Sequence, residues 1–132
     1  MKKYTLLSLG FGLLLLLIIA LANVGFGFFN IVNQIPLGDK IGHFSLFGTM
    51  AFLINKALNC RTKEILGKDV LVGSLILIIF VVAEELSQIF LDYRTFDVTD
   101  LMYDLVGIYV GGFIAVASNQ TFFQTLFRSE LD

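Results

Sequence analysis

The chain has 132 residues, of which 57% are hydrophobic and only 15% are charged, and its formal net charge is −2. Soluble domains average about 25% charged residues, so this composition excludes an ordinary soluble domain and indicates an integral membrane protein. No basic cluster suits nucleic acid, and the single cysteine, Cys60, excludes an internal disulfide and a cysteine zinc site.

Four apolar stretches follow one another along the chain, at residues 6–29, 41–58, 70–91 and 98–117. A helix needs about 20 residues to cross roughly 30 Å of hydrocarbon, and lipid offers the backbone no other partners. Because the connections are short, we expect an all-α, four-transmembrane-helix bundle that forms one domain over residues 1–132. Gly107 and Gly111 make a G-x-x-x-G pair that allows another helix to approach closely.

The first stretch also has the outline of a secretory signal. Lys2 and Lys3 precede it, and Ala20-Leu21-Ala22 fits a small-x-small cleavage site. The apolar character continues past this site to Phe29, which favours a retained helix. An intact N-terminus on the mature protein would decide between the two interpretations.

The basic residues predict the orientation of the bundle. Four spans place seven of the nine on one side: Lys2, Lys3, Lys56, Arg61, Lys63, Lys68 and Arg128. The positive-inside rule makes that side cytoplasmic, so both termini are expected inside the cell, with the protein in the inner or plasma membrane. The opposite side then receives seven of the eleven acids: Asp39, Glu84, Glu85, Asp92, Asp97, Asp100 and Asp104.

Asp39 and Lys40 come just before the second stretch, and His43 follows them at i+4 and i+3, so each lies next to His43 on the predicted helix. His43 is the only histidine, which makes zinc a poor fit, and an imidazole beside a carboxylate is a candidate general acid or base. Asp39 has two interpretations, as a helix cap and as a metal ligand. Lys40 either extends to the membrane surface or binds an anionic group.

Glu85 and Gln88 lie three residues apart near the end of the third stretch, and their spacing predicts a shared helix face. They could serve only as hydrogen-bonding groups between helices. A carboxylate inside a membrane is an expensive way to obtain such a bond, which favours a functional role. We therefore take Glu85 as a catalytic candidate and Gln88 as a substrate-binding one.

The fourth stretch is preceded by Arg94 and Asp97 and begins with Asp100 and Asp104 on one face. Arg94 is either a counter-ion for the acids or a grip for an anionic substrate, and Asp97 is a helix cap or a substrate contact. On this side the acids outnumber the cations, so a bound cation, protonation or water must balance them. Oxygen ligands with one histidine suit Mg²⁺, Mn²⁺ or Ca²⁺.

The chain resembles the VanZ-like family of small membrane proteins over about residues 36–115. Three segments carry the resemblance in order and spacing: Asp39-Lys40-x-x-His43, Glu85-x-x-Gln88 and Arg94-x-x-Asp97-x-x-Asp100-x-x-x-Asp104-x-x-Gly107. The family often has Asn where this chain has Asp104. The resemblance implies a role in the cell envelope, since the founding member is associated with resistance to teicoplanin, a lipid-bearing glycopeptide. It implies no particular reaction.

The first interpretation is an outward-facing acidic site that binds or modifies a lipid-linked or amphiphilic envelope substrate. Its expected residues are Glu85 and His43 for acid–base chemistry, Lys40, Gln88, Arg94 and Asp97 for substrate, and Asp39, Asp100 and Asp104 for a divalent cation such as Mg²⁺. The alternatives are a small proton-coupled transporter and a non-catalytic structural subunit. Membrane lipids are the expected surroundings, and a homo-oligomer is compatible with each interpretation.

Overall fold

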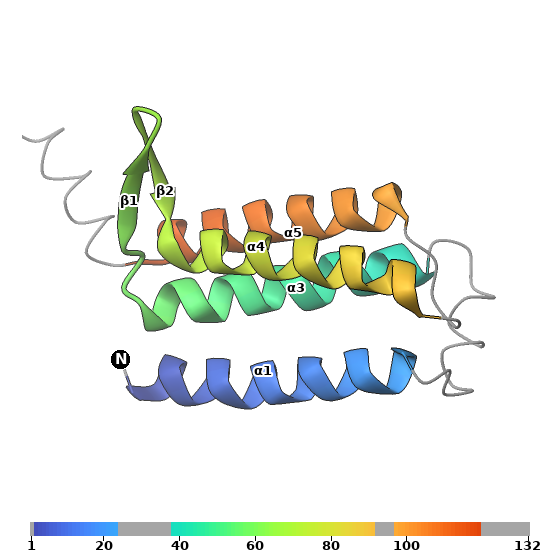
Figure 1. Ribbon diagram of the computed structural model, residues 1–132. Helices are drawn as coiled ribbons and strands as arrows, with labels where there is room; N and C mark the ends of the chain where they lie inside the picture. Colours follow the sequence, from blue (N-terminus) through green and yellow to red (C-terminus); the bar gives the residue numbers. More distant parts are fainter. Residues whose placement is uncertain (1, 24–37, 92–96, 120–132) are drawn as a thin grey trace, which may run out of the picture.

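The computed structural model describes residues 2–23, 38–91 and 97–119. In chain order its elements are α1 (Lys2–Asn23), α3 (Gly38–Ala57), β1 (Thr62–Ile65), β2 (Lys68–Leu71), α4 (Val72–Ser87), the 3-10 turn η1 (Gln88–Phe90) and α5 (Val98–Ala117). Figure 1 shows the helices running side by side in alternating directions. We call the end where α3 and α5 begin the polar end, and the opposite end, which carries the two strands, the hairpin end.

Three segments of the described chain are long and apolar enough to cross a membrane, namely Lys3–Ala22, Val72–Phe90 and Val98–Ala117. The remaining helix, α3, has 20 residues and carries polar side chains near both of its ends. It packs against α1, α4 and α5, so neighbouring helices cover much of its surface. The predicted extension of the first helix to residue 29 lies outside the described residues.

The connection between α3 and α4 contains a β-hairpin, which the all-α prediction did not include. Strands β1 and β2 pair antiparallel, with Thr62 opposite Leu71 and Ile65 opposite Lys68. Leu66 and Gly67 join them and both have positive φ, as a tight hairpin turn requires. The third apolar stretch therefore begins as a strand, and its helix starts at Val72 rather than at residue 70.

Glycines bring α3 and α5 into backbone contact. A Cβ atom added to Gly111 would overlap the carbonyl oxygen of Gly48, and one added to Gly107 would lie 2.5 Å from the carbonyl oxygen of Phe44. The Gly107–Gly111 pair thus faces another helix, as its spacing predicts. This close approach sets the depth and rotation at which the polar residues of α3 meet those of α5.

The apolar core lies between the two ends of the bundle. Its buried members come from α1, α3, α4 and α5: Leu15, Phe47, Met50, Ala51, Leu77, Val81 and Ile108. Large apolar side chains are also exposed on the outer faces of α1, α4 and α5. Apolar residues on both the inside and the outside of a bundle are typical of helices that face lipid.

Candidate functional site

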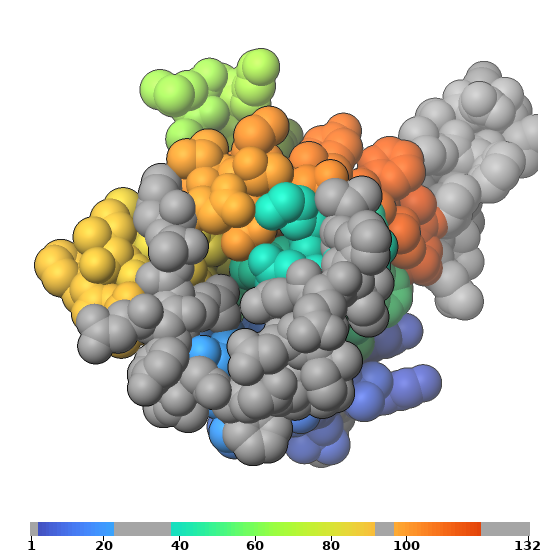
Figure 2. All heavy atoms as spheres, turned by 90° about the vertical axis from the view of Figure 1, so that its right-hand side faces the viewer, coloured from blue at the N-terminus to red at the C-terminus, as the bar shows by residue number. Residues whose placement is uncertain are grey.

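The polar residues of three helices meet at the polar end of the bundle. The first turns of α3 and α5 lie side by side there, with the end of α4 next to them (Figure 2). We call the following residues the polar cluster: Asp39, Lys40, His43, Glu85, Gln88, Asp97, Asp100 and Asp104. The structure therefore brings together all the predicted site residues except Arg94, which lies outside the described part of the chain.

Lys40 joins α3 to the start of α5 through two carboxylates. Its Nζ donates to Asp100 Oδ1 at 2.8 Å and to Asp97 Oδ2 at 3.3 Å. Asp97 also caps α5, because its side chain accepts a hydrogen bond from the backbone N–H of Thr99. That bond, together with Lys40, lowers the pKa of Asp97. The Lys40 ammonium thus lies between two acids, and Asp97 has the predicted capping role.

His43 is surrounded by the three acids that were predicted as metal ligands. Its Nδ1 lies 2.8 Å from Asp104 Oδ1, on α5. On the other side of the ring, Nε2 lies 3.6 Å from Asp39 Oδ1 and 3.9 Å from Asp100 Oδ2. The shortest contact is therefore with Asp104, whereas the spacing along α3 pointed to Asp39. A carboxylate bonded to one ring nitrogen fixes the orientation of the imidazole.

Glu85 is fully buried at the end of α4. The backbone amide of Asp97 faces its carboxylate but does not reach hydrogen-bond geometry, and neither oxygen has a hydrogen-bond partner among the described residues. Gln88, also fully buried, donates instead to Glu84 Oε1 at 2.6 Å. Glu85 and Gln88 therefore share an end of the helix without bonding to each other.

Two groups within the polar cluster have a geometry that could hold a metal ion. One consists of Asp39, His43 and Asp100, and the other of His43, Glu85 and Asp104. In each group one ligand atom per residue lies within 4.8 Å of the others. The second group is the deeper one, since Glu85 and Asp104 are both fully buried. Three of its carboxylate oxygens, both of Glu85 and Oδ2 of Asp104, lack a hydrogen-bond partner within the described ranges.

The chain was compared with known protein families, curated proteins and solved structures. A family model described as VanZ/LLP1 matches residues 4–123, which is most of the chain and includes every residue of the polar cluster. The chain belongs to the VanZ/LLP1 family. Comparison with curated proteins and with solved structures found no significant match. The resemblance inferred from the three segments is thus confirmed, and membership together with three apolar helices makes this VanZ/LLP1 chain a membrane protein.

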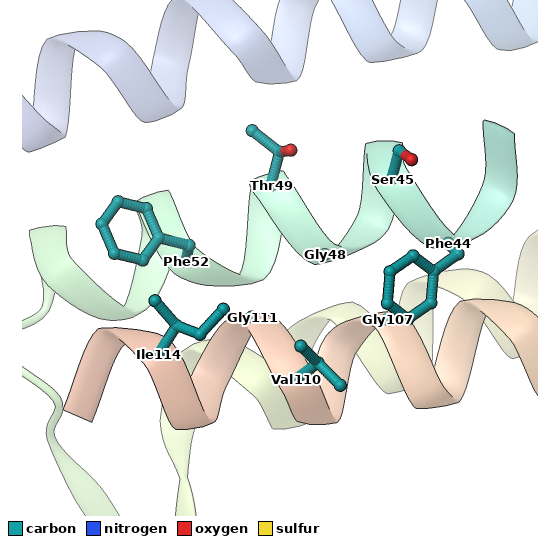
Figure 3. Close-up of a pocket in the computed structure, with 9 residues that line it drawn as sticks. All are labelled: Phe44, Ser45, Gly48, Thr49, Phe52, Gly107, Val110, Gly111 and Ile114. Carbon is teal, nitrogen blue, oxygen red and sulfur yellow. The ribbon is translucent and has the colours of Figure 1, made fainter. Parts of the chain in front are cut away.

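An apolar groove runs along the contact between α3 and α5 in this VanZ/LLP1 protein. It has a volume of about 400 Å³, and its floor is formed where Gly48, Gly107 and Gly111 meet. Figure 3 shows Phe44 and Phe52 on the α3 side, with Ile114 on the α5 side. The sequence contains the glycine spacing that makes this groove, but it does not show which side chains border it.

A second buried polar contact lies toward the hairpin end and was not predicted. Asn55 of α3 is fully buried, and its Nδ2 donates to Ser74 Oγ of α4 at 2.9 Å. Gly73 makes room for it, because a Cβ atom there would lie 2.5 Å from Asn55 Oδ1. A polar residue within an apolar helix is a signal for such a contact, but the sequence alone does not identify its partner.

Proposed function

We propose that this VanZ/LLP1 protein is a multi-pass protein of the cell inner or plasma membrane, with both termini in the cytoplasm. Its polar cluster faces outward and binds or modifies a lipid-linked or amphiphilic envelope substrate. One observation carries the proposal. The fully buried Glu85 carboxylate has no hydrogen-bond partner in the described chain, although His43 and Asp104 lie beside it.

The energetic cost of that arrangement favours a functional role for Glu85. An unpaired buried charge costs several kcal/mol, and ionisable groups within a membrane-spanning helix are costly, although less so near its ends than at its centre. A purely structural role would call for satisfied hydrogen bonds, and neither oxygen of Glu85 has one among the described residues. A carboxylate held without a partner is instead available to a ligand or to a proton in transfer.

The shape of the site favours an amphiphilic substrate. Phe44, at one end of the apolar groove, lies one helical turn from Lys40 on α3. The groove volume of about 400 Å³ lies within the range of small-molecule sites, roughly 300–1,000 Å³. A polar head group at Lys40 and an apolar chain along α3 and α5 would occupy both features at once.

The chemistry available at the site is proton transfer. His43 is oriented by Asp104 at 2.8 Å, and Glu85 belongs to the same group of residues. An imidazole and a carboxyl group this close together could act as general base and general acid on neighbouring substrate atoms. In this proposal Lys40 and Asp97 contact the head group, and Gln88 and Arg94 stay predicted substrate contacts.

A structural role is the second candidate, and the α3–α5 contacts favour it. Lys40 and His43 each join α3 to α5 through carboxylates, which would lock the two helices together. The transporter alternative has less support, because buried apolar side chains fill the space between His43 and Asn55. These side chains are Phe47, Ala51, Val81 and Ile108.

The proposal is tested with cells that lack the protein and carry the wild type or a variant on a plasmid. Their growth is measured in the presence of a glycopeptide. We expect the wild-type protein to protect against a lipid-bearing glycopeptide more than against a glycopeptide without the acyl chain. Glu85→Gln should lose most of this protection at equal abundance in the membrane. Glu64→Gln, the same change on the exposed hairpin, should keep it. Full protection by Glu85→Gln would favour the structural role.

A further inference from the structure

We propose that His43, Glu85 and Asp104 hold a divalent cation at the buried floor of the polar cluster. Helices α3, α4 and α5 supply one ligand each. This inference rests on the proposed function only in placing the cation at the substrate site, where His43 and Glu85 would bind the cation instead of acting as acid and base. Binding of the cation can be measured without any substrate. It also replaces the set predicted from the sequence, which was Asp39, Asp100 and Asp104.

The distances within the group suit a cation without movement of the helices. One ligand atom from each of the three residues lies within 4.8 Å of the other two. A cation bound at about 2.0–2.6 Å keeps its ligands within roughly 4–5 Å of one another. The three side chains therefore already lie at the separations that a bound cation requires.

The burial of two neighbouring carboxylates leaves negative charge that a bound cation would balance. Glu85 and Asp104 are fully buried, and three of their four oxygens have no hydrogen-bond partner among the described residues. Asp104 Oδ1 contacts His43, which supplies one positive charge at most. A divalent cation would balance both carboxylates and provide ligand bonds for the oxygens that now have none.

We call Asp39, His43 and Asp100 the outer group, and His43, Glu85 and Asp104 the inner group. The outer group is a weaker cation site than the inner group. Asp100 already accepts a hydrogen bond from Lys40 at 2.8 Å, so the lysine ammonium balances its charge. The Asp39 side chain is 43% exposed, which leaves it to water. Of the predicted ligands, only Asp104 lies on the Nδ1 side of the His43 ring. The geometry thus favours the inner group.

The ligand types narrow the identity of the cation. Two carboxylates and one imidazole are too few nitrogen or sulfur ligands for a structural zinc site. Carboxylates and water suit Mg²⁺, Ca²⁺ and Mn²⁺, and of these Mn²⁺ also accepts imidazole nitrogen readily. Mn²⁺ is therefore the probe of choice, because its electron paramagnetic resonance signal reports both binding and a nitrogen ligand.

Full-length protein in detergent, stripped with EDTA and dialysed, is titrated with Mn²⁺ while the signal of the free ion is recorded. We expect one Mn²⁺ per chain, and an affinity at least about tenfold lower for Glu85→Gln. Asp39→Asn, in the outer group, should bind like the wild type. Electron spin echo modulation of the bound ion should show one ¹⁴N coupling that His43→Gln removes.

Three results would overturn the cation site. The first is a wild-type protein that does not bind Mn²⁺. The second is a Glu85→Gln variant that binds Mn²⁺ as tightly as the wild type, and the third is an Asp39→Asn variant that loses as much affinity as Glu85→Gln. Far-UV circular dichroism and size-exclusion elution of each variant show whether it is folded, so that loss of binding is not mistaken for unfolding. Mn²⁺ binding and the protection of cells are separate measurements. Absence of Mn²⁺ binding with intact protection would reject the cation site alone, and Mn²⁺ binding without protection would reject the envelope function alone.

Discussion

Lys40→Met is expected to destabilise the folded protein by about 2–3 kcal/mol, measured by thermal unfolding in detergent. The change keeps most of the apolar stem and removes the ammonium that contacts Asp97 and Asp100. Breaking a fully buried ion pair costs about 3–5 kcal/mol because a buried charge is left unpaired. We expect less here because the Lys40 side chain is 22% exposed and water partly screens its charge.

Two further variants distinguish the loss of this ion pair from a general effect of removing a lysine. Lys63→Met, on the exposed strand β1, should change stability by less than about 0.5 kcal/mol. Combining Lys40→Met with Asp100→Asn should recover most of the lost stability, because the acid left without its partner is then neutral. If Lys40→Met were as mild as Lys63→Met, the contact with Asp100 would be a screened surface pair.

Gly111→Ala is expected to destabilise the protein by about 1–3 kcal/mol, because overpacking a close helix contact forces the backbones apart. The added methyl group would overlap the carbonyl oxygen of Gly48 on α3, and a backbone atom cannot rotate away as a side chain can. Separation of α3 from α5 should also lengthen the 2.8 Å contact between His43 and Asp104. We therefore expect weaker Mn²⁺ binding as well as a lower unfolding temperature.

Gly10→Ala is the matched control for this change. Gly10 lies within helix α1, and a Cβ atom there would meet nothing within 4 Å. Because alanine favours a helix over glycine by about 1 kcal/mol, this variant should be as stable as the wild type or slightly more stable. Equal behaviour of the two variants would mean that α3 and α5 are not held at backbone contact.

Hydropathy and spacing predicted much of the fold. The fourth apolar stretch coincides with α5, because a long run of lipid-compatible residues has few ways to satisfy its backbone other than a helix. The hairpin was missed because β1 and β2 have only four residues each and lie beside a strong helical signal. Helix α4 was predicted too long, since it tightens into η1 at Gln88.

The sequence predicted which residues gather in the candidate site better than it predicted which of them contact each other. Charge and spacing predict that His43 and Asp104 lie at a similar depth in the membrane. Only the packing of α3 on α5 brings His43 Nδ1 into contact with Asp104. Spacing placed Glu85 and Gln88 on one helix face and so made them candidate partners. In the structure, however, Gln88 donates its side-chain hydrogen bond to Glu84. Contacts between helices depend on their rotation about their own axes, and sequence spacing describes each helix only by itself.

The central claim is that Glu85 is held for a ligand and is not part of the scaffold. Thermal unfolding of the wild type and of Glu85→Gln, each in EDTA and in excess Mn²⁺, tests this claim most directly. In EDTA we expect Glu85→Gln to be more stable by about 1–2 kcal/mol, because it removes an unpartnered buried carboxylate. Excess Mn²⁺ should stabilise the wild type more than the variant, because a tenfold weaker affinity lowers the stabilisation by about 1.4 kcal/mol. A variant that is less stable than the wild type in EDTA, with the same response to Mn²⁺, would contradict the account and make Glu85 a structural residue.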